Sequence, residues 1–349
     1  SSDRVGGRVA TDLIDGFRCD RGFQVINPRY PEVVKSNLLK RLDFLPLPRA
    51  IDLVAEKTVI KAAPNMWSAI NPRLGSLRNK VSLTKYLSSA DESSAEAAFL
   101  SIGAGDLYRQ VLKPFLAGVL LTDPKNVSNR ATKELVRSFI RSSPGIPAMG
   151  VGEFARNLAL PLHDIQLSTP VESLHDGFVR TKKGKVSGDC IIVATDPVTA
   201  AQLLGSPQAP RMNQSTTWYH ALDEGEITSQ RLRIDMKNSG PVINSIAISN
   251  LSPYYSPGGK TLISSTTITP ASESEVRRHL AQLWKVSTQS WDLVSKYELK
   301  QSLPRHEVGQ ASEQSVQIKP NLFVVGDHRG LPSQQGAMYS GRRAAELIN

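Results

Sequence analysis

The chain has 349 residues, of which 40% are hydrophobic and 21% charged, as expected for a folded protein of one or two domains. No apolar run reaches the roughly 18 residues of a membrane-spanning helix. The net charge is +10, but Lys and Arg are scattered rather than grouped. This pattern favours a solvated basic surface over nucleic-acid binding and leaves peripheral contact with an anionic membrane open.

Cysteines and histidines exclude further classes of protein. Cys19 and Cys190 are too few for a disulfide framework and form no CxxC pair. We therefore expect structural thiols and a reducing compartment such as the cytoplasm, with an organelle or a membrane periphery as alternatives. The six histidines lack metal-ligand spacing, so no metal site is expected.

Hydrophobic periodicity indicates an alternation of strands and helices. Short strands are expected at residues 8–11, 17–20 and 22–26, before a proline-interrupted region that ends near residue 87. Residues 91–142 have helical periodicity, with a helix start at Asp91–Ser94 and apolar stripes at 107–116 and 133–140. After a break at 144–147, the expected elements are a helix over 151–160; strands over 165–167, 171–174, 178–180 and 189–195, the last buried on both faces; a hairpin turn at 182–185; strands and turns over 215–270; a helix over 273–286; a strand over 322–325; and a helix over 336–348.

The N-terminal segment Asp3-Arg4-Val5-Gly6-Gly7-Arg8 combines two glycines with flanking arginines. Paired glycines expose backbone N–H groups to a ligand, and arginines donate charge-assisted hydrogen bonds to phosphate. The pattern indicates a phosphate-binding loop. A plain glycine turn with solvated arginines is the alternative.

The C-terminal region has a strand, Phe323–Val325, that ends in Gly326-Asp327, and a helix that begins near Gly336-Ala337. A carboxylate at the carboxyl end of a strand lies where doubly wound folds bind ligands, and a ribose or ribityl hydroxyl is its natural partner. The free N–H groups of the helix start suit an anionic or carbonyl-bearing ligand. The alternative is a tightly packed strand–helix corner.

Together the two motifs resemble the FAD-dependent amine oxidase, protoporphyrinogen oxidase and phytoene desaturase-like flavoprotein superfamily. After their first nucleotide-binding unit, its members carry an arginine, two further residues and a glycine-arginine pair. They end in a Gly-Asp strand followed by a glycine-alanine helix. Further segments that match are Gly16–Gln24, Pro114–Val119, Ile146–Gly150, Val171–Ser173 and Val193–Pro197.

The resemblance implies FAD as the cofactor and a set of residues that contact it. These residues are Arg4, Gly6, Gly7 and Arg8 along the pyrophosphate; Gly22, Phe23 and Gln24 at the flavin ring; Val171 at the adenine, through its backbone; Thr195 on a returning strand of the cofactor domain; Gly326 and Asp327 at the ribityl or pyrophosphate region; and Gln335, Gly336 and Ala337 at the pyrimidine side of the flavin. The helix start would stabilise negative charge on the reduced ring.

The implied fold is α/β, with a discontinuous FAD-binding domain (Rossmann-like, glutathione-reductase-type), a mixed-sheet substrate domain and a helical insert. The FAD-binding domain is expected over 1–40, 150–215 and 300–349, and the substrate domain over 41–149 and 216–299. Family members open with a strand and a Gly-x-Gly-x-x-Gly loop, a unit of about 30 residues that does not precede Ser1. We expect its absence to weaken FAD binding.

The implied activity is hydride transfer from a C–H bond of a small apolar or amine-bearing substrate to flavin N5, as in a desaturase or oxidase. Amine oxidases place a lysine near the flavin; Lys237 and Lys260 are candidates, but exposed lysines are the favoured interpretation, so no catalytic residue is assigned. The alternatives are an amine oxidase proper and a flavin-free remnant that acts as a binding module. Four aromatic residues are predicted either to line an apolar pocket or to pack in the core: Trp218, Tyr219, Tyr254 and Tyr255.

Overall fold

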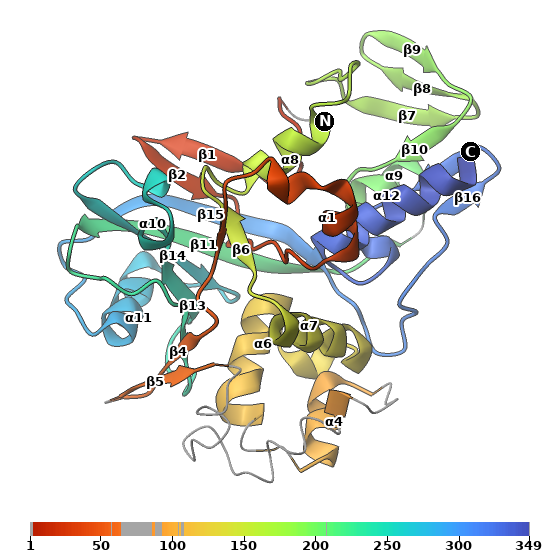
Figure 1. Ribbon diagram of the computed structural model, residues 1–349. Helices are drawn as coiled ribbons and strands as arrows, with labels where there is room; N and C mark the ends of the chain where they lie inside the picture. Colours follow the sequence, from red (N-terminus) through yellow and green to blue (C-terminus); the bar gives the residue numbers. More distant parts are fainter. Residues whose placement is uncertain are drawn as a thin grey trace.

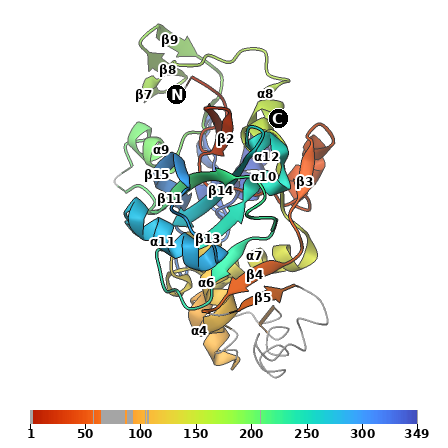
Figure 2. The ribbon, with the colours of Figure 1, turned by 90° about the vertical axis from the view of Figure 1, so that its left-hand side faces the viewer.

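The computed structural model describes residues 3–56, 58–63, 86–87, 93–103, 105, 108–206 and 208–348. A long sheet occupies the centre of the molecule, with a helical insert at one end and a small three-stranded sheet at the other (Figure 1). Figure 2 shows the same order from the side. Within the described ranges, no helix is long and apolar enough to cross a membrane.

The central sheet is mixed and has seven strands. In spatial order they are β15 (Asp292–Pro304), β11 (Met212–Asp223), β14 (Lys260–Thr267), β13 (Val242–Ala247), β12 (Arg233–Asp235), β4 (Ile51–Val54) and β5 (Val59–Ala62). Only β12 and β4 pair in parallel. Side chains alternate between the faces of a strand. Trp218 therefore packs in the core beneath α11 (Glu273–Trp284), whereas Tyr219 packs in the core on the opposite face.

Helix α11 covers one face of this sheet because its apolar residues recur at helical spacing. Val276, Leu280 and Leu283 are buried against the sheet. The helix begins with a capping box, in which Ser272 accepts a hydrogen bond from the Glu275 amide and the Glu275 carboxylate accepts one from the Ser272 amide. The prediction of a helix over 273–286 is confirmed, apart from its last two residues.

A smaller sheet contains β10 (Ile191–Val193), β17 (Leu322–Val324) and β16 (Gln317–Lys319). The first two strands pair in parallel although they are far apart in the sequence, and each is followed by a helix, α9 (Pro197–Leu203) or α12 (Gln334–Ile348). The prediction that the 189–195 strand is buried on both faces is wrong. Ile192 is 46% exposed because its side of β10 borders a large cavity.

The helical insert confirms the periodicity predicted for residues 91–142. It contains α4 (Ala95–Ser101), a π-helical turn (Tyr108–Leu112), α6 (Lys113–Leu120) and α7 (Asn129–Arg141). Ser94 caps α4 through the Ala97 amide, and Phe99 stacks between the rings of Tyr86 and Tyr108. The predicted positions Asp91, Glu92 and Leu107 lie outside the described residues.

The N-terminal region is a hairpin of β1 (Thr11–Ile14) and β2 (Phe17–Asp20), closed by Asp15 and Gly16, which both have positive φ. The first strand thus begins at Thr11, later than predicted.

The remaining elements are α1 (Pro31–Ser36); β3 (Phe44–Pro46), paired with β6 (Gly145–Pro147); α8 (Gly152–Ala159); α10 (Ile248–Leu251); the 3₁₀ turns Leu38–Lys40, Pro124–Asn126, Pro253–Tyr255 and Asp327–Arg329; and the three-stranded sheet of β7 (Val171–His175), β8 (Phe178–Thr181) and β9 (Gly184–Ser187).

Two predicted strands are not formed, whereas the predicted turn at 182–185 closes the β8–β9 hairpin. In the 22–26 segment, only Ile26 pairs with another strand, through an isolated bridge to Gly145. The side-chain amide of Gln24 donates to the carbonyls of Arg8 and Arg21, so side chain–backbone bonds replace a ladder there. The 165–167 segment is irregular and runs along the cavity.

Candidate functional site

A cavity of about 2550 Å³ lies between the central sheet, the helical insert and the two terminal regions of the chain. All but one of the predicted cofactor-binding residues line it: Arg4, Gly6, Gly7, Arg8, Gly22, Phe23, Gln24, Thr195, Gly326, Asp327, Gln335, Gly336 and Ala337. Val171 does not. It begins β7 and is 37% exposed, so its contact with adenine stays a prediction.

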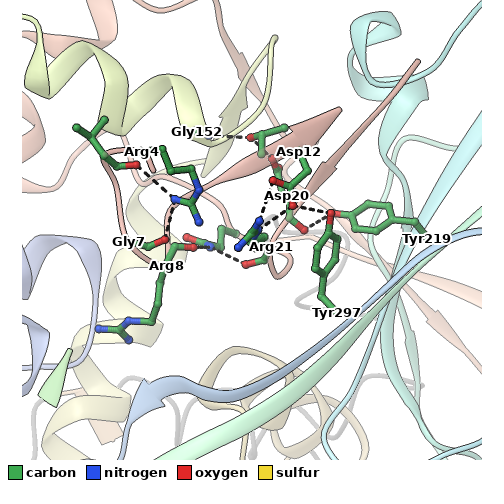
Figure 3. Close-up of polar contacts among 12 residues, drawn as sticks. Arg4, Gly7, Arg8, Asp12, Asp20, Arg21, Gly152, Tyr219 and Tyr297 are labelled. Atoms are coloured by element: carbon green, nitrogen blue, oxygen red, sulfur yellow. Dashed lines mark hydrogen bonds and ion pairs between the residues drawn. The ribbon is translucent and has the colours of Figure 1, made fainter. Parts of the chain in front are cut away.

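The N-terminal glycine pair forms a tight turn at the cavity wall. The Val9 amide donates to the Gly6 carbonyl, and a guanidinium nitrogen of Arg4 donates to the Gly7 carbonyl at 3.0 Å (Figure 3). Gly6 has φ +101°, and a Cβ there would lie 2.4 Å from the Val9 carbonyl oxygen. Gly7 also has positive φ, but no described atom outside its two chain neighbours lies within 4 Å of where its Cβ would be. The backbone at Gly7 is therefore open to close approach by a ligand.

Arg8 connects this turn to the C-terminal motif. Its guanidinium donates to the Asp327 carboxylate at 2.6 Å and to the Ser302 carbonyl at 2.9 Å. The Asp327 side chain is only 7% exposed, whereas Arg8 is 36% exposed. Because guanidinium has five N–H donors, Arg8 can hold this carboxylate and still donate to a further anion.

The C-terminal strand–helix corner requires glycine at two positions. A Cβ at Gly326, which has φ +148°, would lie 2.7 Å from the His328 ring. A Cβ at Gly336 would lie 2.2 Å from the Leu331 carbonyl oxygen. The Ser333 hydroxyl accepts from the Gly336 amide at 3.0 Å and so caps α12. The predicted start of this helix at Gly336 is two residues late, because α12 begins at Gln334.

The end of β10 supplies a second set of polar groups. The Asp196 carboxylate accepts from the amides of Val198 and Thr199 and so caps α9, next to Thr195 at the cavity. Burial alone would raise the pKa of Asp196, but hydrogen bonds from Thr199 and Val198 hold it below its ordinary value. This carboxylate therefore stays ionised at neutral pH.

A buried carboxylate, Asp20, locks the N-terminal hairpin to the rest of the molecule. It accepts from the hydroxyls of Thr11 and Tyr255 and from the Val151 amide. Burial raises the pKa of Asp20 to about 6, although these hydrogen bonds lower it. Figure 3 shows Asp20 near Asp12; the Tyr219 hydroxyl donates to the Asp20 carbonyl, and the Tyr297 hydroxyl donates to the Asp12 carboxylate. The lock fixes the strand that leads directly into Arg21 and Gly22 at the cavity.

The central sheet gives the cavity a neutral polar floor. This floor contains Asn213, Ser215, Asn244, Thr266 and Gln301. Asn213 is fixed by donating to the Leu120 carbonyl and accepting from Arg305, whereas the buried Thr266 hydroxyl has no hydrogen-bond partner among the described residues. The sequence prediction missed this set. Its only signal was the run of five polar residues Asn213–Thr217 at the start of a region with strand signals.

The helical insert provides the facing wall. Its apolar part includes Phe115, Gly118 and Val119. Its basic part comprises Arg130, Lys133, Arg137 and Arg141 of α7, all of which line the cavity. The sequence prediction also missed these four residues, although their spacing places them on one face of a helix.

Most other candidates lie outside the cavity. Lys237 and Lys260 are partly exposed and pair with Glu56 and Asp223, so neither is placed as a lysine near a flavin would be. Of the predicted aromatic residues, Trp218, Tyr219 and Tyr255 are buried in the core, Tyr254 is 52% exposed, and none borders the cavity. Cys19 is buried and Cys190 is half-buried.

Comparison with known proteins identifies the family. The family model of the flavin containing amine oxidoreductases matches residues 1–349, so the chain belongs to this family of oxidoreductases. Such enzymes act on small molecules. A search of curated proteins gave no match.

Solved structures share the fold at low sequence identity. An oxidoreductase from Methanosarcina mazei superposes with a TM-score of 0.77 at 14% identity, over 99% of this chain and 92% of that one. Putrescine oxidase bound to putrescine gives 0.70 at 15% identity, over 99% and 92%. Reduced UDP-galactopyranose mutase gives 0.69 at 14% identity, over 99% and 88%. The predicted fold class is confirmed.

Proposed function

We propose that the chain is an FAD-dependent oxidoreductase that removes hydride from a C–H bond of a small apolar or amine-bearing substrate, as desaturases and oxidases do. The observation that supports this most is the single cavity in which the glycine turn, the Arg8–Asp327 pair and the start of α12 meet a separate polar floor. A cofactor and a substrate can thus share one cavity.

The residues at the cofactor side fit FAD chemically. The open backbone at Gly7 and the guanidinium of Arg8 suit a pyrophosphate. Asp327 suits a ribityl hydroxyl, and the start of α12 at Gln334 suits the carbonyl-bearing edge of a flavin. When bound, the flavin would accept the hydride at N5.

The chain itself would position the substrate and exclude water. The apolar wall at Phe115 and Val119 would bury the hydrocarbon part of a substrate, and the floor would orient polar groups through Asn244 and Thr266. We assign no proton-transferring residue. Oxygen, a quinone or another acceptor would then reoxidise the flavin.

Anaerobic mixing tests this proposal. Protein loaded with FAD is mixed without oxygen with a panel of amines and of apolar alkenes and carboxylates, and flavin absorbance is followed. We expect bleaching by at least one member that is suppressed in Phe115→Ala and preserved in Tyr254→Ala, which lies outside the cavity. Bleaching that is the same in both variants would show that chemistry does not use this cavity.

A further inference from the structure

The most unusual feature of the cavity is the charge of its helical wall. Four basic residues of α7 occupy positions 130, 133, 137 and 141, and Arg29 adds a fifth charge from the loop before α1. Among the described lining residues of this wall and loop, Glu134 is the only carboxylate, and it pairs with Arg137 at 2.6 Å. Among the described residues, this part of the cavity therefore has more basic than acidic side chains.

A hydrogen-bonded seam fixes the loop against α7. Asn27 donates to the side chain of Ser138, and the hydroxyl of Tyr30 also bonds to Ser138. Arg29 lies between Asn27 and Tyr30 in the loop, and Arg141 follows Ser138 by three residues on the helix. The seam thus holds both arginines along the same border of the cavity.

The charges of this border are not neutralised within the described chain. Neither Arg29 nor Arg141 forms an ion pair with a described residue, and both are exposed. Lys133, in contrast, is only 6% exposed, and its ammonium lies 5.4 Å from the centroid of the Tyr86 ring. Buried or clustered cations at a cavity wall are stabilised by an anionic ligand and disfavour a cationic one.

We propose that the substrate is an amphipathic molecule with an anionic group, a carboxylate being the simplest, which binds Arg29 and Arg141 while its apolar part lies along Phe115 and Val119. The inference rests on the proposed function because it names the substrate class for the same cavity. It disfavours amines, whose positive charge would lie against the basic wall.

Ligand binding tests the inference independently of flavin chemistry. Decanoate, decanol and decylamine share one apolar chain and differ in charge, and their affinities are measured by calorimetry with protein that has, and has not, been loaded with FAD. We expect decanoate to bind about tenfold more tightly than decanol, and decylamine to bind most weakly. Equal affinities for the three ligands would overturn the inference.

Three variants localise the effect. Arg29→Gln combined with Arg141→Gln should remove the advantage of decanoate over decanol. Arg49→Gln is the matched control, because Arg49 donates to the Ile140 carbonyl at the end of the same helix but does not line the cavity. Glu134→Gln should strengthen decanoate binding, since it releases Arg137. Equal loss of decanoate binding in the double variant and in Arg49→Gln would overturn the inference in favour of general surface charge.

The same variants separate this inference from two others. Salt-sensitive binding to vesicles of anionic phospholipid, lost in the double variant without any change in decanoate affinity, would assign the arginines to a membrane contact and overturn the substrate assignment. Retention of FAD with no preference for decanoate would leave the proposed function intact and remove only its anionic substrate. Absence of FAD binding with a clear preference for decanoate would remove the proposed function, and with it the substrate assignment, and would leave only a binding site for an anionic amphipathic ligand.

Discussion

The Arg8 guanidinium lies 2.6 Å from the Asp327 carboxylate, and this ion pair joins the N-terminal glycine turn to the C-terminal strand–helix corner. The two residues are 319 positions apart in the chain. Their contact brings the N-terminal and C-terminal motifs together at one cavity. Because both residues line the cavity, we expect the pair to have a structural and a binding consequence.

Replacement of Arg8 should reveal both consequences. In Arg8→Gln, the nearly buried Asp327 loses its ionic partner, and we expect the free energy of unfolding to fall by about 1–3 kcal/mol, because Arg8 is itself partly exposed. Affinity for FAD should fall as well. Urea unfolding measures the first effect, and Arg156→Gln, which removes the exposed pair with Glu153, should cost less than about 0.5 kcal/mol. Equal losses in the two variants would contradict this account.

The start of α12 can be tested with two glycines of the same helix. Gly336→Ala brings a Cβ to within 2.2 Å of the Leu331 carbonyl oxygen at the cavity, whereas a Cβ at Gly341 would meet no described atom within 4 Å apart from its chain neighbours and the backbone of its own helix. We expect Gly336→Ala to lose FAD, as measured by flavin absorbance after desalting. Gly341→Ala should keep FAD and be as stable or slightly more stable. Loss of FAD in both variants would mean that the helix as a whole, rather than its first turn, is sensitive.

The buried Asp20 predicts a specific pH dependence. Its folded-state pKa of about 6 is above the ordinary 3.8, so the folded protein binds the proton more tightly than the unfolded chain. Asp20 therefore contributes stability at low pH that is lost as pH rises from 3.8 to about 6, on the order of 3 kcal/mol in total. Urea unfolding of the wild-type protein and of Asp20→Asn at several pH values measures the difference. The free energy of unfolding of the wild-type protein minus that of Asp20→Asn should fall as pH rises through this range. A value that stays constant or rises with pH would be evidence against a raised pKa.

His220 predicts the opposite slope. Burial between β11 and α11 lowers the pKa of His220 from 6.5 to about 4. The positive charge of Arg277 also lowers this pKa, whereas the charge of Glu273 raises it. The unfolded chain thus binds this proton more readily, and stability is lost as pH falls from 6.5 towards 4, again by about 3 kcal/mol. In His220→Leu this acid-induced loss should be reduced. A variant as acid-sensitive as the wild-type protein would show that other groups dominate.

The parts of the site that depend on local chemistry could be predicted from the sequence. Glycine is required at positions 6, 7 and 336 by positive φ or by close approach of another atom. Each requirement is met by the residue type at a single position, so it can be recognised in the sequence. The Gly-Asp corner at 326–327 is equally local. The two motifs could therefore be recognised before their contact through Arg8 was known.

The parts that depend on tertiary contacts could not. Asn244 and Thr266 meet on the cavity floor through the pairing of β13 with β14, which includes a register shift that no local pattern reveals. The 22–26 segment has the composition of a strand, yet Gln24 bonds to two loop carbonyls instead. The basic residues of α7 have the spacing of one helix face in the sequence. That spacing alone does not determine whether the face meets solvent or a cavity, which depends on the fold.

The most direct test of the central claim is titration of the purified chain with FAD, followed by flavin fluorescence and by the visible spectrum after desalting. The chain is compared with the same chain preceded by the strand and glycine loop of a family member, and each is tested with and without Gly336→Ala. We predict that FAD binds, that the added unit tightens binding, and that Gly336→Ala weakens it in both forms. If both forms are folded and neither binds FAD, the cavity is not a flavin site and the proposed function is wrong.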